Sequence, residues 1–407
     1  MAIRFTATIM RNIALKAVSG VPWIRQDCLA ACAMIVLALN AISCAGEQPP
    51  KSLRRSKDAS SNGPLLSAEE WRVLDRAVDR GLDFISKNQA RDGSFATDPA
   101  GQPGVTSLCV LAFLARGHQP GKGPYGSRLT QAIDYVLSMQ DPDVGSIYPD
   151  RLVVGWTHRS YTGNYNHGIS GLMLAEVYGM TQGSRQQRIR STITKALEYT
   201  RSQQTRFKRN RDDKGGWRYG HITGSIDADL SISAWQMMFL RAARNAEFDV
   251  PEQWMREGLE YVHRTFDAKE GGFMYGLQGN RRYCSRATVG AGIICLELGG
   301  QHHSKPALAA GDWILQHSFE QYNSSRHPDE RYHYSAFYCS QAMFQLGGEH
   351  WHRFFPPFLK TLSEAQNNDG SWDRESVRDM KYGTVYTTAL AVLALATPYQ
   401  LLPIYQR

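Results

Sequence analysis

Two aspartates separated by one residue, Asp227 and Asp229, have the spacing best suited to acid catalysis. A neighbouring group can hold the proton of a carboxylic acid in place until it is donated. A structural role competes with this one, because acidic side chains at a helix start accept hydrogen bonds from its free N–H groups. In that role Ser225 or Asp227 would cap a helix before Leu230. The pair is therefore either a proton source or a helix cap.

Other polar and aromatic residues stand at the start of further apolar segments. They are Thr106, Tyr165, His167, Tyr283, Cys284, Arg286, His333, Tyr334, Tyr382 and Tyr386. They predict a polar, aromatic ring over an apolar cavity, which is the usual form of a small-molecule site. Trp235 and Tyr338 add aromatic faces that can stabilise a cation. We expect these side chains to bind substrate: Tyr165, His167, Trp235, Tyr283, Arg286, His333, Tyr338 and Tyr386.

Several other kinds of chemistry find no support. No Gly-x-Ser-x-Gly, His-Glu-x-x-His or phosphate-binding glycine loop occurs, which argues against a serine hydrolase, a zincin or a nucleotide enzyme. The adjacent His302 and His303 suit an exposed loop better than a metal site. The seven cysteines contain no Cys-x-x-Cys spacing. Four of them are expected to be buried thiols, unless export pairs two of them: Cys109, Cys284, Cys295 and Cys339.

A repeat of helix, glycine turn and apolar segment must position these residues. Its clearest copies place a glutamine, a glycine and an aromatic residue at fixed spacing, as in Gln89/Gly93/Phe95 and Gln366/Gly370/Trp372. Weaker copies surround Gly145, Gly216 and Gly272, and one copy between Gly311 and Gly347 has lost its glycine turn. Repeats of this length indicate a closed or stacked array of similar units. We count six units over residues 65–400.

The two helices of each unit differ in character. The first is amphipathic, with Trp71, Leu74, Val78, Leu82 and Ile85 at helical spacing and charged residues between them. The second is apolar nearly all round, as in residues 386–396, so it must be buried on most faces. Six buried helices backed by six amphipathic ones predict an all-α protein, an (α/α)6 toroid of six helical hairpins. Sustained alternation is absent, so we expect almost no sheet.

The Gln-x3-Gly-x-Trp pattern resembles the QW motif of the terpene cyclase and protein prenyltransferase superfamily. Three further segments resemble exported toroid proteins of planctomycete bacteria: Tyr165 to Gly168, Tyr338 to Gly348 and Pro398 to Arg407. The resemblance implies the α/α toroid of that superfamily. It also implies that the residues of the motif cap helices and connect units, a structural role for Gln89, Gln366, Trp217 and Trp372.

The resemblance also suggests a reaction. Squalene–hopene cyclases of this superfamily carry Asp-x-Asp-Asp on an inner helix, and Asp227-Ala-Asp229 is similar except that Leu230 replaces the last aspartate. It implies Asp229 as proton donor, Asp227 as its partner and an apolar isoprenoid in the central cavity. Such a protein would be an isomerase of the terpene cyclase type. The leading hypothesis is therefore a terpene-cyclase-like protein that binds or cyclises an isoprenoid. The alternative is a non-catalytic binding or scaffolding toroid, which the missing aspartate and the single barrel favour.

Two further alternatives stay open at this point. A periplasmic saccharide-active enzyme on the same fold would place two carboxylates opposite each other. A prenyltransferase would use zinc bound by Asp-x-Cys and a later histidine, for which Cys284 and His333 are in suitable units. Arg282 stands where that aspartate is needed, however. We therefore expect no metal and no cofactor, and we rank prenyltransferase activity below the terpene cyclase reaction.

The amino-terminal segment is typical of a targeting signal. Residues 1–45 contain basic residues followed by the uncharged stretch from Cys28 to Cys44, which indicates a signal peptide or anchor. Cleavage after Ala45, lipidation at Cys44 and retention in the membrane all remain open. Residues 46–64 are a polar, Pro- and Ser-rich spacer, expected to be a disordered linker before the toroid domain at 65–407. We expect an exported protein, in the periplasm or cell envelope.

The charge distribution argues against a nucleic-acid partner. The net charge of +8 is concentrated in residues 1–63, which carry eight basic and three acidic residues. The remaining chain is close to neutral, so it lacks the basic surface that nucleic-acid binding needs. The expected partner is a small molecule, with membrane attachment through the amino-terminal segment as an option.

Overall fold

A computed structural model describes residues 65–148, 159–220, 226–376 and 378–406. These residues belong to one compact unit, Pro64–Arg407. The predicted signal and linker, residues 1–64, lie outside the described residues.

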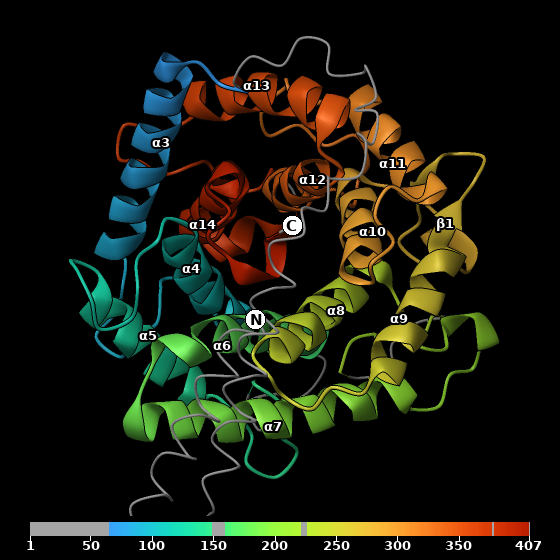
Figure 1. Cartoon of the computed structure of the whole chain (residues 1–407), viewed down its shortest axis with the longest axis horizontal. Coiled ribbons are helices and arrows are strands. Elements are labelled where there is room, and N and C mark those ends of the chain that lie inside the picture. Colours follow the sequence, from blue (N-terminus) through green and yellow to red (C-terminus); the bar gives the residue numbers. More distant parts are fainter. Residues whose placement is uncertain (1–64, 149–158, 221–225, 377, 407) are drawn as a thin grey trace, which may run out of the picture. The chain divides into compact units, whose positions relative to one another are not determined.

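Two concentric rings of helices make up this unit (Figure 1). The inner ring consists of α4 (Gly104–Ala115), α6 (Arg159–Val177), α8 (Leu230–Asn245), α10 (Arg286–Leu298), α12 (Tyr332–Leu346) and α14 (Gly383–Leu395). The outer ring consists of α3 (Ala68–Lys87), α5 (Gly126–Ser138), α7 (Gly183–Thr205), α9 (Glu252–Thr265), α11 (Lys305–Gln316) and α13 (Gly348–Glu364). Each inner helix packs against the next, and α14 packs against α4, which closes the ring. The predicted all-α toroid is confirmed.

The hydrophobic pattern explains which helices are inside. Every residue of α4 and of α10 is buried, because apolar and small side chains occupy all their faces. In α3 only one face is buried, with Leu74, Val78 and Leu82 turned inward and charged residues facing solvent. The burial of apolar surface between the rings is the main favourable contribution to this arrangement.

A repeated glutamine contact connects successive outer helices. In four turns the glutamine side chain donates one hydrogen bond to the glycine carbonyl of its own turn and one to a carbonyl of the next outer helix, at 2.9–3.1 Å. The four glutamine–glycine pairs are Gln89–Gly93, Gln140–Gly145, Gln204–Gly215 and Gln366–Gly370. The third turn thus uses Gly215 rather than the expected Gly216. These contacts are structural.

The turn tryptophans also connect elements. The indole N–H of Trp217 donates to the Thr200 carbonyl, and that of Trp372 donates to the Leu362 carbonyl, both at 2.8 Å. Both rings are completely buried. They therefore pack the turns against the outer helices rather than facing a ligand.

Extended structure is almost absent from the described residues. A two-stranded antiparallel hairpin pairs β1 (Phe266–Asp267) with β2 (Gly272–Phe273). Short 3-10 helices lie in the connections: Pro99–Gly101, Tyr178–Met180, Arg211–Asp213, Gly279–Arg281, Arg378–Tyr382, Thr397–Tyr399 and Pro403–Tyr405. Among the described helices, none is long and apolar enough to cross a membrane.

The carboxyl-terminal segment packs across the inner helices. Tyr405 places its ring beside Phe337 of α12, and its hydroxyl contacts the Met238 sulfur of α8 at 3.3 Å. Gln345, near the end of α12, donates a hydrogen bond of 2.7 Å to the Tyr405 carbonyl. The last residues thus bridge two inner helices that are not neighbours in the ring.

Candidate functional site

The amino-terminal ends of the six inner helices surround a cavity of about 860 Å³. Every inner helix contributes lining residues: Gly104, Val105 and Leu108; Tyr165, Asn166 and Ile169; Ser231; Ala287 and Thr288; Tyr334; and Tyr386. The helix starts converge because all six inner helices run in the same direction around the ring. The cavity therefore lies where the sequence predicts it.

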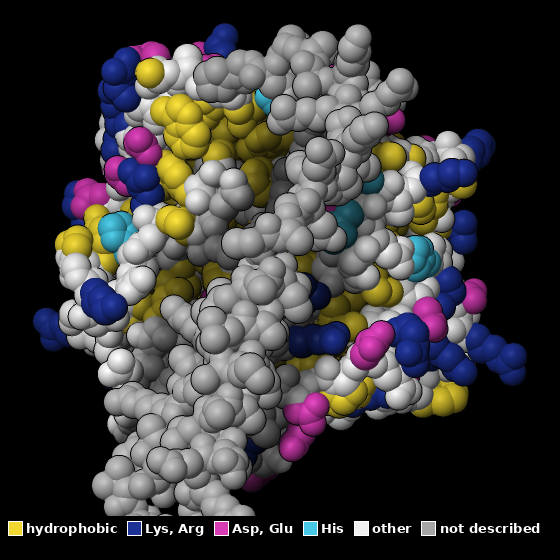
Figure 2. Space-filling model, in the orientation of Figure 1, with side chains coloured by type: hydrophobic (Ala, Val, Ile, Leu, Met, Phe, Trp, Pro, Cys, Tyr) yellow, Lys and Arg dark blue, Asp and Glu magenta, His cyan; other side chains and the backbone are white. Residues whose placement is uncertain are grey.

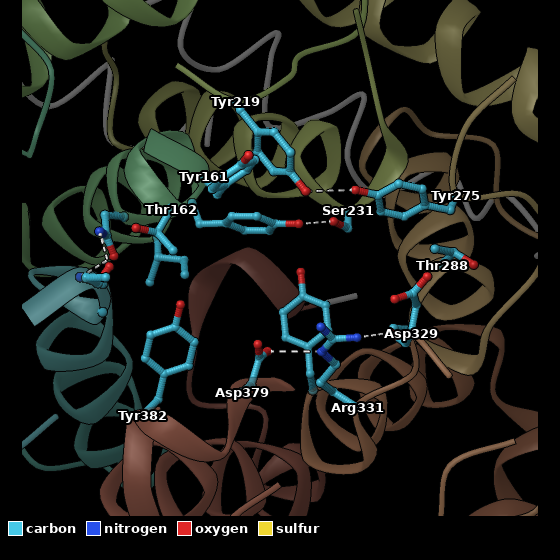
Figure 3. Close-up of a pocket in the computed structure, with 18 of the residues that line it drawn as sticks. Tyr161, Thr162, Tyr219, Ser231, Tyr275, Thr288, Asp329, Arg331, Asp379 and Tyr382 are labelled. Atoms are coloured by element: carbon cyan, nitrogen blue, oxygen red, sulfur yellow. Dashed lines mark hydrogen bonds and ion pairs between the residues drawn. The ribbon is translucent and has the colours of Figure 1, made fainter. Parts of the chain in front are cut away.

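The connections before the inner helices supply most of the functional groups. Figure 3 shows Tyr219 and Tyr275 on one side of the cavity and Asp379, Arg331 and Tyr382 on the other. Eight tyrosines line it: Tyr161, Tyr165, Tyr219, Tyr275, Tyr283, Tyr334, Tyr382 and Tyr386. The charged lining residues are Arg218, Arg281, Arg331, Lys381, Asp329 and Asp379. The wall is thus rich in hydrogen-bonding groups, which alternate with an apolar surface of similar extent.

Asp229 lies behind this wall. Its side chain is completely buried and caps α8, with Oδ1 accepting the N–H of Ile232 at 3.0 Å. The same oxygen accepts the Ser231 hydroxyl at 3.0 Å, while Oδ2 forms an ion pair with Arg218. Ser231 in turn shares a hydrogen bond with the Tyr165 hydroxyl. Asp229 is therefore connected to the cavity only through side chains that line it.

Asp227 does not form the predicted carboxylate pair with Asp229. Burial raises the pKa of Asp227, but hydrogen bonds and charge from Arg209 outweigh this effect and hold the pKa below the usual value. Asp227 is also not among the cavity-lining residues. The expectation that Asp227 caps α8 is wrong, because Asp229 does so, and Ser225 lies outside the described residues. The two carboxylates are bound to different arginines, Arg209 and Arg218.

A different carboxyl group faces the cavity. Asp379, in the 3-10 helix Arg378–Tyr382, has an exposed side-chain fraction of 26% and lies 3.3 Å (Oδ2 to Nε) from Arg331 (Figure 3). Burial raises the pKa of Asp379, and the nearby Arg331 lowers it by less. Asp379 therefore keeps a proton more readily than a free aspartic acid does. The sequence reasoning included Tyr382 but missed Asp379, although both precede the start of α14.

Three predicted binding residues line the cavity, namely Tyr165, Tyr283 and Tyr386. His167 does not, because its ring is buried between Ile147, whose N–H it accepts at 3.1 Å, and Thr200, at 2.8 Å. Burial lowers the pKa of His167 to about 3, so the ring is neutral. His167 thus stabilises the packing of α6 rather than a ligand.

Trp235 and Tyr338 also have partners inside the protein. The Trp235 N–H donates to the Tyr334 hydroxyl at 2.8 Å, and its ring stacks on Phe337 at 5.3 Å. Tyr338 packs edge-on against Trp235 and is completely buried. Both aromatic side chains fill the space between α8 and α12. The expectation that they face a substrate is corrected accordingly.

Arg286 and His333 form contacts that stabilise the connection before α12, which lacks a glycine turn. Arg286 forms a buried ion pair with Glu330 and donates to the carbonyls of Ser318 and Ser324. His333 lies 3.5 Å from Glu375, whose carboxylate accepts the N–H groups at the start of α12. Neither side chain lines the cavity. The buried contacts with Glu330 and Glu375 explain why polar residues occur at these positions.

The described residues contain no group of three or more side chains that could hold a metal ion. Cys109, Cys284, Cys295 and Cys339 are free thiols, and all but the half-buried Cys284 are buried. Burial raises the pKa of the Cys284 thiol to about 12, so it is not a reactive thiolate.

Comparison with solved structures identifies the architecture. A variant of the type II terpene cyclase MstE from Scytonema, in complex with its product merosterolic acid A, matches with a TM-score of 0.54 and 16% identity over 83% of this chain and 100% of its own. A glycosidase variant matches with a TM-score of 0.56 and 12% identity, over 83% and 100%. The chain is an α/α toroid.

A third match extends the range of activities on this toroid fold. An inactive variant of the α-1,6-mannanase GH76A from Salegentibacter sp. HEL1_6, in complex with α-1,6-mannotriose, has a TM-score of 0.54 and 11% identity over 82% of this chain and 99% of its own. No protein-family model and no curated protein sequence matches the chain. Identities this low establish the shared fold, and the same fold carries different reactions.

Proposed function

We propose that the protein is a saccharide-active enzyme that binds a carbohydrate in the central cavity and cleaves a glycosidic bond. The observation that carries this proposal is the wall itself, in which tyrosine hydroxyls and charged side chains surround the cavity-facing carboxyl of Asp379. Hydroxyl-rich ligands can replace the water that such groups would otherwise bind. The glycosidase and the mannanase on the same fold support the proposal.

The charged wall is the reason to prefer a saccharide over an apolar isoprenoid. An isoprenoid that filled the cavity would remove water from Arg281 and Lys381, two lining cations, without offering hydrogen bonds in return. Burying polar groups in this way costs about 1–3 kcal/mol for each unsatisfied group. A saccharide avoids that cost because its hydroxyls donate and accept.

The proposed reaction uses the two carboxyl groups of the cavity wall. Protonated Asp379 donates its proton to the glycosidic oxygen, and the bond from that oxygen to the anomeric carbon breaks. Water adds to this carbon, and Asp329 accepts the proton that the water loses. A raised pKa suits Asp379 to the acid role, and the contact with Arg331 holds its carboxyl group in place.

The second candidate is the cyclisation of an isoprenoid. It is favoured by the apolar part of the wall, which consists of Val105, Leu108, Ile169 and Ile226 together with the tyrosine faces. Aromatic faces stabilise carbocations. In this reaction Asp379 would replace the predicted Asp229 as the proton source, because Asp229 is bound by Arg218. A scaffolding toroid would bind a ligand without either reaction.

The test is a substrate screen with the full chain. We expect shorter saccharides, detected by mass spectrometry, from at least one member of a panel of polysaccharides. Asp379→Asn should lower the rate by about 100-fold or more, since general acid catalysis contributes that much. Asp249→Asn is the matched control, because Asp249 is an exposed aspartate in the connection between α8 and α9.

Two outcomes would overturn the proposal. One is a cyclic product from squalene or a linear prenyl substrate, which disappears in Asp379→Asn, with no saccharide cleaved. The other is tight saccharide binding without cleavage, which would support the scaffolding role.

Export is a separate part of the proposal. It rests on the order of basic and apolar residues in 1–45 and on no structural observation. Fractionation of cells that produce the full chain should find it in the periplasm or cell envelope. Recovery with the cytoplasmic proteins would contradict export.

A further inference from the structure

The cavity lining carries four cationic side chains, Arg218, Arg281, Arg331 and Lys381, but two carboxyl groups, Asp329 and Asp379. Arg218 is paired with Asp229 behind the wall, and Arg331 is paired with Asp379. Arg281 and Lys381 also line the cavity, but neither forms an ion pair with a carboxylate of the described residues. Positive charge that lines a cavity attracts anions and raises their local concentration. The cavity therefore has two cationic side chains available for a ligand.

Both of these cations lie against tyrosine rings of the wall. The Arg281 guanidinium lies 6.0 Å from the centroid of the Tyr275 ring, and the Lys381 ammonium lies 5.0 Å from that of Tyr382. Figure 3 shows Tyr275 and Tyr382 on opposite sides of the cavity. A ligand held between these rings would meet one cation at each side. Contacts of this kind hold a long side chain in place while its charge stays available.

A stack of flat rings continues from Arg281 along one wall. Tyr275 is stacked on Tyr283 with centroids 5.4 Å apart, and Tyr283 is stacked on His327 at 4.1 Å. Tyr283 belongs to the cavity lining, whereas His327 does not. Tyr283 is therefore covered by a ring at each of these contacts, and the stack holds this part of the wall in place beside Arg281.

We infer that the saccharide is acidic and that Arg281 and Lys381 bind carboxylate or sulfate groups on successive sugar units. The inference rests on the proposed function and specifies its substrate class. Arginine binds planar carboxylates and sulfates through two hydrogen bonds, and lysine binds them as a point charge. The wall has more cations than carboxyl groups. A neutral saccharide carries no negative charge to pair with the additional cations, whereas an acidic saccharide does.

The experiment measures the binding of matched acidic and neutral ligands to full-chain Asp379→Asn, which should not consume them. One pair is an oligogalacturonate and its methyl ester, and the other is a sulfated oligosaccharide and its desulfated form. We expect an acidic ligand to bind at least tenfold more tightly than its neutral counterpart, and its affinity to fall with added salt. The pair that shows the difference distinguishes carboxylate from sulfate recognition.

Variants test the two cations individually. Arg281→Gln and Lys381→Gln should each weaken acidic binding by about tenfold and leave neutral binding unchanged. The control Arg256→Gln/Lys269→Gln removes two positive charges from exposed positions and should have little effect. Equal melting temperatures would show that all variants are folded.

The outcomes separate this inference from the proposed function. Equal binding of acidic and neutral saccharides, or unchanged acidic binding in both cation variants, overturns the inference and leaves the saccharide proposal standing. If no saccharide of either kind binds, both are overturned.

Discussion

At the residue scale, two aspartates near one cavity differ because of their arginine partners. Asp229 is completely buried, caps α8 and pairs with the equally enclosed Arg218. Asp379 is partly exposed to the cavity, and its contact with Arg331 is longer. The contacts of the first carboxylate all lie inside the protein, whereas burial raises the pKa of the second, which faces the cavity. The same residue type therefore serves stability in one place and chemistry in the other.

Removal of Asp229 should mainly destabilise the protein. Asp229→Ala leaves the Arg218 charge buried without its partner and uncaps α8, so we expect the free energy of unfolding to fall by about 3–5 kcal/mol. Urea unfolding followed by circular dichroism measures this. The control is Glu69→Ala, which breaks an ion pair with Arg72 whose side chains are 67% and 66% exposed and should change stability little. Equal losses in both variants would contradict the structural role of Asp229.

The sequence could predict that the site residues lie at the starts of the inner helices. It could not predict which of these residues face the cavity. Tyr165, Tyr283 and Tyr386 were predicted from their position alone and line it. His167 and His333 were predicted by the same rule, but they are buried against other side chains. A shift of one or two residues on a helix turns a side chain to another neighbour. Spacing alone does not specify that rotation for a helix buried on all faces.

At the element scale, four glutamine–glycine turns each join one outer helix to its neighbour. Gln366 belongs to the turn after α13 and donates to the Ala77 carbonyl of α3, so this turn connects the last outer helix to the first. Gly370 has a φ of +93°, and a Cβ there would lie 2.3 Å from the Arg80 carbonyl oxygen. Glycine is thus required twice, for the backbone angle and for the close approach.

Gly370→Ala tests this turn. We expect it to lower the free energy of unfolding by about 1–3 kcal/mol more than Gly300→Ala. Gly300 is the matched control, since its φ of +76° is also positive but an added Cβ meets nothing within 4 Å. The difference between the two variants therefore reports the clash with Arg80. If both variants lose the same amount, the turn does not need the close approach.

The helices themselves were largely predictable. An apolar segment such as residues 386–396 has no polar face for solvent, which predicts an inner helix. An amphipathic segment such as α3 has one polar face, which predicts an outer helix. The connections were not predictable in this way. Residues 317–331 are held by the buried Arg286, and the position of Asp379 depends on Arg331, a contact between distant parts of the chain.

At the scale of the whole molecule, ring closure depends on contacts between the chain ends. α14 packs against α4 and α3, and the carboxyl-terminal segment bridges α8 and α12. Glu176, at the end of α6, is buried next to this segment and contacts the backbone of Ile404. Burial raises the pKa of Glu176 to about 8, so its carboxyl is protonated at neutral pH. The repeat predicted a closed ring, but the sequence did not predict this contact.

Glu176 gives the stability of the ring a defined pH dependence. Its pKa is about 8 in the folded chain, compared with a reference value of 4.5, so the folded state binds the proton more tightly than the unfolded state. Its contribution to stability is fully present below pH 4.5 and is lost as the pH rises through 8. The unfolding free energy of the wild-type chain should therefore decline as the pH rises from 4.5 to 8, and that of Glu176→Gln should decline less. Parallel curves for the two proteins would contradict the assignment.

The most direct test of the account is the pH profile of saccharide cleavage by the wild-type chain and by Asp379→Asn. A general acid must be protonated to act, so the wild-type rate should fall as the pH rises through the raised pKa of Asp379. Asparagine carries no such proton, so the variant should be slower by about 100-fold or more and lack that alkaline decline. A variant that cleaves at the wild-type rate with the same alkaline decline would contradict the assignment of Asp379 as the acid.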